Sequence, residues 1–169
     1  MIETIDGITT DTLYLTSMSR AFDRSNLKSI DLTGLNASNI TNMYCAFSEN
    51  SKLTAINIST LDTSKVTNME GLFSKCTALE TYTFPAINLD SIATVCDRYG
   101  RRSEGICYMF SGCTNLKSLD VSNLVIHNES SAEPRVDAMY GVFSNCSSLE
   151  SLDLSTWDMT YVRDIEALC

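Results

Sequence analysis

Residues Leu53 to Cys76 read Leu-Thr-Ala-Ile-Asn-Ile-Ser-Thr-Leu-Asp-Thr-Ser-Lys-Val-Thr-Asn-Met-Glu-Gly-Leu-Phe-Ser-Lys-Cys, and this stretch decides the fold. It begins with a strand phrase, Leu-x-x-Ile-x-Ile, in which apolar and polar residues alternate at the end, as in a short β-strand with one buried face. It continues to a turn phrase, Met-x-x-x-Phe, which places two large apolar side chains on one face of a single helical turn. Neither phrase carries enough apolar surface to fold alone, so each must pack against other copies.

Both phrases recur along the whole chain at a nearly fixed period. The turn phrases that begin at Met43 and Met69 are 26 residues apart, and those at Met18 and Met43 are 25 apart. A period of this size is typical of a stacked-repeat protein. Strand phrases begin at Ile2, Leu27, Leu53, Leu79, Leu116 and Leu149, and turn phrases begin at Met18, Met43, Met69, Ile106, Met139 and Ile165.

The repeats predict an α/β solenoid that forms a single domain over residues 1–169. We expect a stack of about six short parallel strands on one wall, with short helices or turns on the opposite wall. The phenylalanine that closes each turn phrase should then form a continuous aromatic column in the interior. The members of this column are Phe22, Phe47, Phe73, Phe110 and Phe143.

Two consecutive repeats carry extra residues, at about 88–105 and 125–138. From Leu61 to Met69 is 8 residues, whereas the matching distance is 19 before Ile106 and 15 before Met139. Both insertions fall between a strand phrase and a turn phrase, so in a stack they should emerge side by side on one edge. They are either tolerated variation in loop length or a binding surface.

The insertions contain the residues that we select as candidates for partner binding. The first includes Asp97-Arg-Tyr-Gly-Arg-Arg-Ser-Glu-Gly105, and arginine and tyrosine are enriched at binding hot spots. The second contains the only histidine of the chain. We therefore expect a recognition patch made by Arg98, Tyr99, Arg101, Arg102 and His127.

Three of the seven cysteines, Cys76, Cys113 and Cys146, share one slot, three residues after the phenylalanine of the turn phrase. They are either buried thiols that line the stack, or two of them form a disulfide between adjacent repeats. The chain has no Cys-x-x-Cys motif, and the single histidine has no partner at metal-ligand spacing. We therefore expect no metal site and no cofactor.

Composition and charge argue against several functional classes. The net charge of −9 disfavours nucleic acid and anionic membrane surfaces as partners. No apolar stretch approaches 18 residues, so we expect no membrane insertion, and the first residues lack the pattern of a signal peptide. The sequence contains no nucleophile–base pair and no glycine-rich phosphate loop, so we expect no enzymatic activity.

The combined pattern Val-Thr-Asn-Met-x-x-x-Phe-Ser-x-Cys-x-x-Leu-x-x-Leu-Asp-Leu-Ser resembles the repeats of the BspA-like leucine-rich-repeat surface proteins, which include bacterial and mycoplasmal lipoproteins and adhesins. The pattern is clearest from Leu53 to Cys76 and returns as Phe143-Ser-Asn-Cys-Ser-Ser-Leu-Glu-Ser-Leu-Asp-Leu-Ser155. The resemblance covers nearly the whole chain. It implies a leucine-rich-repeat-like solenoid that acts as a binding or adhesion module at a cell surface, with a protein or glycan partner and no catalytic residues.

A second class of role stays open beside this one. The chain begins in a strand phrase at Met1-Ile2 and stops at the apolar Ala167-Leu-Cys169, and uncapped end repeats can pair with other chains. The chain could therefore be a structural component of a larger assembly, such as a virion or appendage protein assembled in the cytoplasm through end-to-end or homo-oligomeric contacts.

Overall fold

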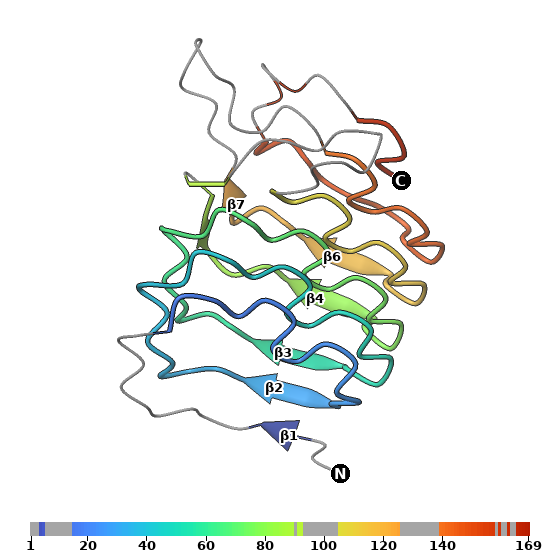
Figure 1. Ribbon diagram of the computed structural model, residues 1–169. Coiled ribbons are helices and arrows are strands. Elements are labelled where there is room, and N and C mark those ends of the chain that lie inside the picture. The colour runs from blue at the N-terminus through green and yellow to red at the C-terminus, as the bar shows by residue number, and fades with distance from the viewer. Residues whose placement is uncertain are drawn as a thin grey trace.

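The computed structural model describes residues 4–5, 15–89, 91–92, 105–125, 139–157, 159, 162 and 165–169. Their backbone winds into coils stacked on one another, with β1 at one end of the stack and the last residues toward the other (Figure 1). Within these ranges the chain forms seven strands and no helix. The strands are β1 (Thr4–Ile5), β2 (Ser29–Asp31), β3 (Ala55–Asn57), β4 (Thr81–Thr83), β5 (Ile87–Asn88), β6 (Ser118–Asp120) and β7 (Leu124–Val125).

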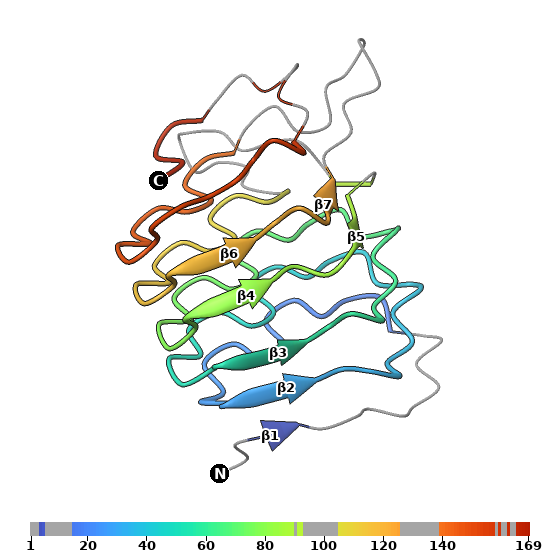
Figure 2. The ribbon, with the colours of Figure 1, turned by 180° about the vertical axis from the view of Figure 1, so that it is seen from behind.

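One side of the stack is a wall of short parallel strands that coincide with the strand phrases (Figure 2). Ile30 pairs with Ile56, and Tyr82 pairs with Leu119, so equivalent repeat positions lie in register. The sixth phrase contributes one bridge, from Ser118 to Ser151. The wall is nevertheless divided, because β1, β2 and β3 form one sheet and β4 and β6 form another. The single ladder of six strands that the period suggests is therefore not what the structure shows.

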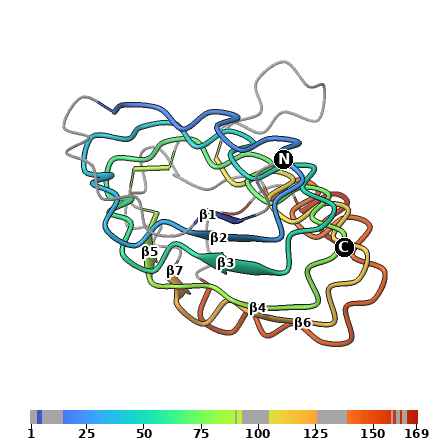
Figure 3. The same cartoon turned by 90° about the horizontal axis from the view of Figure 1, so that it is seen from below.

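A third, two-stranded sheet lies at a corner of the coil, beside the main strand wall (Figure 3). It pairs β5 with β7, with Ile87 opposite Leu124 and Asn88 opposite Val125. These two strands were not predicted from the sequence.

The opposite wall consists of successive turns. Alternate N–H groups donate to the next coil: Met43 N to Asn68 O at 2.8 Å, Cys45 N to Glu70 O at 2.8 Å, and Phe47 N to Leu72 O at 3.0 Å. Between them, the Tyr44 N–H donates to the side-chain Oδ1 of Asn42, and the Ala46 N–H donates to Met43 O, three residues back along the chain. A helix would need bonds four residues back, and the neighbouring coil supplies the acceptors instead. For the described residues, the short helices of our prediction are wrong and the turns are confirmed.

Backbone conformation explains why the turn phrase does not become helical. Its third residue has a positive φ in every described copy, which is the left-handed region that an α-helix excludes. These residues are Arg20 (φ 55°), Cys45 (50°), Gly71 (60°), Tyr108 (55°), Gly141 (63°) and Ala167 (53°). Side chains at this slot lie over the neighbouring coils, so a Cβ added to Gly141 would lie 2.8 Å from the Tyr108 ring.

The predicted phenylalanine column is confirmed. Ring centroids from Phe22 to Phe47, Phe73, Phe110 and Phe143 follow at 5.7, 5.4, 5.5 and 6.0 Å, with rings within 23° of parallel. All but Phe22 are fully buried. Leucine, isoleucine and methionine side chains of the two phrases surround the column and complete one continuous core.

A column of thiols lies beside the rings. The Sγ atoms of Cys76, Cys113 and Cys146 donate at 3.2 Å to the carbonyls of Phe47, Phe73 and Phe110, respectively. Asn50 occupies the same slot one repeat earlier, and its Nδ2 donates to Phe22 O at 2.6 Å. All three cysteines are free: Cys76 and Cys113 are buried, as the interpretation as thiols lining the stack predicts, whereas Cys146 is only partly buried. Burial raises the pKa of Cys76 to about 12 and that of Cys146 to about 11.

Candidate functional site

The residues selected from the sequence for partner binding are not among those that the structure describes. Arg98, Tyr99, Arg101, Arg102 and His127 all lie outside the described ranges, so the recognition patch stays a prediction. What the structure does describe is the frame from which the two insertions leave the stack.

Both insertions are anchored in two adjacent coils. Because β5 pairs with β7, the chain approaches the two insertions from neighbouring strands. After the insertions, the Tyr108 N–H donates to Tyr140 O at 3.0 Å and the Phe110 N–H to Val142 O at 2.9 Å, so the returning segments are also neighbours. The described residues nearest to the insertions are therefore held together by backbone hydrogen bonds on both sides.

A pair of tyrosines lies on the turn wall close to the ends of the insertions. The rings of Tyr108 and Tyr140 meet edge to face, with centroids 5.3 Å apart at 75°. Tyr108 is 36% exposed, and partial burial, followed by the nearby Tyr140 and Glu70, raises its pKa. The absence of a side chain at Gly141 leaves room for the Tyr108 ring.

Tyrosine combines an apolar ring with a polar tip and is enriched at binding surfaces. This pair was not selected from the sequence, although Tyr108 lies three residues after Gly105 and Tyr140 one residue after Met139, the first described residues that follow the two insertions. The short distance in sequence between each tyrosine and an insertion is the signal that could have identified the pair.

At the other end of the turn wall, polar side chains of neighbouring coils form a cation–π contact and ion pairs. The Arg20 guanidinium lies 5.3 Å from the centre of the Tyr44 ring, and Arg24 and Lys75 bond the two carboxylate oxygens of Glu49 at 2.7 and 3.0 Å. These two hydrogen bonds lower the pKa of Glu49 to about 2. Such exposed ion pairs contribute little to stability individually. Here they link neighbouring coils at the edge of the turn wall.

The strand wall has a hollow of about 320 Å³ that extends over β3, β4 and β6 and includes the point where its two sheets separate. Thr54 and Ile56 line it on the β3 side. On the β4 and β6 side the lining includes hydroxyl groups and one carboxylate, from Thr81, Thr83, Ser118 and Asp120. The surface is therefore polar at its rim, with strand backbone on both sides.

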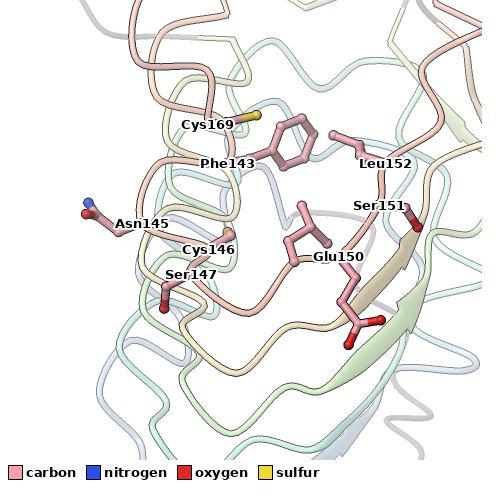
Figure 4. A pocket seen from close by; sticks show the side chains of 9 residues that line it. Phe143, Asn145, Cys146, Ser147, Glu150, Ser151, Leu152 and Cys169 are labelled. Atoms are coloured by element: carbon pink, nitrogen blue, oxygen red, sulfur yellow. The ribbon is translucent and has the colours of Figure 1, made fainter.

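A second hollow, of about 270 Å³, lies among the last coils (Figure 4). Phe143, Leu149, Leu152 and Cys169 are among the residues that line it. Close by in the chain, Ile165 is 54% exposed. This end of the described stack thus presents apolar groups together with an exposed free thiol.

The described residues do not form a metal site or a membrane-spanning helix. Within the described ranges, no group of three or more His, Cys, Asp or Glu side chains is placed to hold a metal ion. No helix of sufficient length and apolar character to cross a membrane occurs in that part of the chain. Cys107, next to Tyr108, is disulfide-bonded.

The parallel strand wall, the turn wall and the repeat-matched core define a solenoid repeat protein. The chain belongs to the family described as "Mycoplasma protein of unknown function, DUF285", which matches residues 8–96 and 101–169. Among solved structures it is similar to the leucine-rich repeat protein TpLRR of T. pallidum, with 18% identity, 88% of this chain and 78% of that chain covered, and a TM-score of 0.36. No curated protein matches the chain.

Proposed function

We propose that the chain is a non-enzymatic binding module of the BspA-like leucine-rich-repeat type, which recognises a protein or glycan partner through the edge that carries the two insertions. One observation carries this proposal: hydrogen bonds between adjacent coils hold the described residues on both sides of the two insertions. Two inserted segments on neighbouring coils can contribute to one surface. The family, made of repeat proteins, is compatible with such a role.

The tyrosine pair, in which Tyr108 is exposed and Tyr140 is partly buried, fits the same edge. Tyr108 and Tyr140 offer aromatic surface that can stack on a sugar ring or on a partner side chain. The candidate residues Arg98, Tyr99, Arg101, Arg102 and His127 would add hydrogen-bond donors from the insertions. The net charge of −9 favours partners that are neutral or basic over acidic ones.

The test is binding of the purified chain to arrays of immobilised glycans and of immobilised extracellular proteins. For any spot that is bound, we expect Tyr140→Ala and deletion of residues 97–104 each to reduce binding at least about tenfold, as expected for a hot-spot residue. Tyr44→Ala is the matched control, because Tyr44 occupies the same repeat slot as Tyr140 but packs with Arg20, away from the insertions. It should bind like the wild type.

Equal loss in Tyr44→Ala and Tyr140→Ala would contradict recognition at this edge. So would unchanged binding after the deletion, provided that thermal melting shows the deleted chain to be folded. A module of this kind would work at a cell surface as part of a longer exported chain, which surface labelling of cells that express the native gene would test.

A structural component of a larger assembly is the second candidate, and the hollow at the last coils favours it. The partly buried side chains of Leu149 and Leu152, which line this hollow, can pack against another chain. The chain would then assemble into a virion or a cytoplasmic particle through end-to-end contacts. Sedimentation over a range of concentrations separates the candidates: ordered multimers that Leu152→Glu disperses support assembly, and a monomer throughout supports the binding module.

A further inference from the structure

The coil of β3 and the coil of β4 are joined by backbone hydrogen bonds on the turn wall but not on the strand wall. On the turn wall the two coils are fully joined, with the Met69 N–H donating to Gly105 O at 2.7 Å and the Phe73 N–H to Met109 O at 2.8 Å. On the strand wall, the described residues 54–58 and 80–84 share no backbone hydrogen bond, and β3 and β4 belong to separate sheets. Figure 2 shows the wider spacing between these two strands.

Two aromatic side chains account for the opening. The other described residues at the inward slot of Tyr82 are aliphatic: Ile30, Ile56, Leu119 and Leu152. The Tyr82 ring leans toward the preceding coil, where its centroid lies 5.5 Å from that of Phe73, and Phe84 meets Phe73 at 6.1 Å. Because the two rings pack on the interior side of the strands, against Phe73 and Phe110 of the phenylalanine column, β3 and β4 do not approach to the usual strand spacing of about 4.8 Å.

The backbone at the opening is left with unused hydrogen-bonding groups. Ala55 and Asn57 bond β2, since the Ala55 N–H donates to Lys28 O and Asn57 O accepts from the Leu32 N–H. Backbone groups of successive residues in a strand point to alternate edges, so those of Ile56 point toward β4. The Phe84 N–H donates to Asp120 O and Glu80 O accepts from the Ser118 N–H, so by the same alternation Thr81 and Thr83 point toward β3.

We propose that the opening between β3 and β4 is a binding site for an extended polypeptide segment, which enters as an additional strand and pairs with both edges. This site is separate from the insertion edge of the proposed function. An extended peptide backbone repeats N–H and C=O groups at the spacing that Ile56, Thr81 and Thr83 present, which no other common ligand does. The hollow of about 320 Å³ is at the lower limit of ligand pockets, which suits a short run of residues with small side chains.

The rest of the site agrees with a peptide occupant. Thr54, Thr81, Thr83 and Ser118 place small hydroxyl side chains around the hollow, so the approach to the backbone edges is not blocked by bulky groups. Insertion of a strand requires the edges to stand about two strand spacings apart, near 9.6 Å. The turn wall can act as the hinge for this widening, because its hydrogen bonds between the two coils do not involve the strand edges.

The experiment measures amide hydrogen exchange of Ile56, Thr81 and Thr83 by NMR, with and without a millimolar concentration of the capped peptide acetyl-Thr-Val-Thr-Val-Thr-amide. In the wild type we expect fast exchange without peptide and about tenfold slower exchange with it. Tyr82→Phe keeps the ring and should respond in the same way. The double variant Tyr82→Leu with Phe84→Leu restores aliphatic residues at both slots, as in the other coils, so its three amides should be protected without peptide and should not respond to it.

Several results would overturn the proposal. These are protection of the three amides in the wild type without peptide, the lack of any peptide effect in the wild type and Tyr82→Phe, or an equal peptide effect in the double variant. The same protection by cellotetraose would assign the hollow to glycans instead. Deletion of residues 97–104 should leave the peptide effect unchanged, so failure here and failure of the proposed function are separate outcomes. Melting curves confirm that each variant is folded.

Discussion

Single residues at the edge of the turn wall link the coils electrostatically, and Glu49 is the centre of one such link. Its carboxylate bonds Arg24 on one neighbouring coil and Lys75 on the other. These bonds lower its pKa from the ordinary 4.5 to about 2. A carboxyl with a lower pKa in the folded state stabilises the fold above its unfolded pKa and loses this contribution as the pH falls toward the folded value.

We therefore predict that the melting temperature falls between about pH 4.5 and pH 2, and that Glu49→Gln reduces the size of this fall. Other carboxylates with lowered pKa values, such as Asp31 and Asp120, also contribute to the acid sensitivity, so the difference between the two proteins is the quantity to compare. Melting curves at low salt measure it. Parallel pH profiles for the wild type and Glu49→Gln would show that the ion pairs do not form in solution.

In the core, Phe73 contacts more aromatic rings than any other member of the column. Its ring lies against Phe47, Phe110, Tyr82 and Phe84. We predict that Phe73→Ala destabilises the protein by about 3–5 kcal/mol, because it leaves a cavity in the middle of the stack. Urea denaturation measures the loss. Phe22→Ala, at a partly buried position next to one ring only, should cost clearly less, and equal costs would contradict the packing described.

Gly141 shows where a glycine is required by a neighbouring side chain. It has a φ of 63°, and an added Cβ would meet the Tyr108 ring at 2.8 Å, whereas at Gly112 it would meet the flexible Cγ of Lys75 at 3.0 Å. We predict that Gly141→Ala costs about 1–2 kcal/mol more than the conformational strain that both positions share. Adding Tyr108→Ala to Gly141→Ala should recover most of the difference in urea denaturation. No recovery would exclude the ring contact as the cause.

At the scale of elements, the sequence predicted what depends on the period and missed what depends on backbone conformation. The register of β2 with β3 and the aromatic column follow from residues about 26 positions apart, which the period places one above the other. Met43 and Phe47 are four residues apart, a spacing that suits a helical turn and two successive β-turns equally well. Only the positive φ of Cys45 and the bonds to the next coil decide between them.

The other misses have local physical causes. The division of the strand wall follows from the size of Tyr82 and Phe84, which occupy slots that the repeat pattern treats simply as apolar. The β5–β7 pair rests on two strands of only two residues each, Ile87–Asn88 and Leu124–Val125, which are too short to show a strand periodicity. For the candidate site, the positions of the insertions could be predicted from the sequence. The contact between Tyr108 and Tyr140 could not, because it depends on how the stack brings the two residues together.

The thiol column gives a prediction for chemical reactivity. Alkylation requires a thiolate, and burial raises the pKa of Cys76 to about 12 and raises that of Cys113 as well. We predict that iodoacetamide at about pH 8 modifies the exposed Cys169 while Cys76 and Cys113 stay unmodified until the protein is unfolded. Peptide mass spectrometry identifies the modified positions. Modification of Cys76 in the native protein at the rate of Cys169 would contradict its place in the core.

At the scale of the whole molecule, the stacking of the coils stabilises the fold and also creates the two surfaces that we propose for binding. Each coil completes its core and its backbone hydrogen bonds only with the coils on either side, so the described coils support one another along the stack. The same arrangement brings together segments far apart in sequence, at the insertion edge and at the opening between β3 and β4. Both proposed binding surfaces therefore depend on the stack itself.

The central claim is that successive repeats lie directly above one another around the phenylalanine column. Its most direct test is a nuclear Overhauser measurement between assigned ring protons of Phe47, Phe73 and Phe110 in solution. The stack predicts cross-peaks from Phe73 to both other rings, whose centroids lie 5.4 and 5.5 Å away although Phe110 is 37 residues further along the chain. If Phe73 shows contacts to neither ring in the folded protein, the stacked coil is contradicted, and both proposed binding surfaces with it.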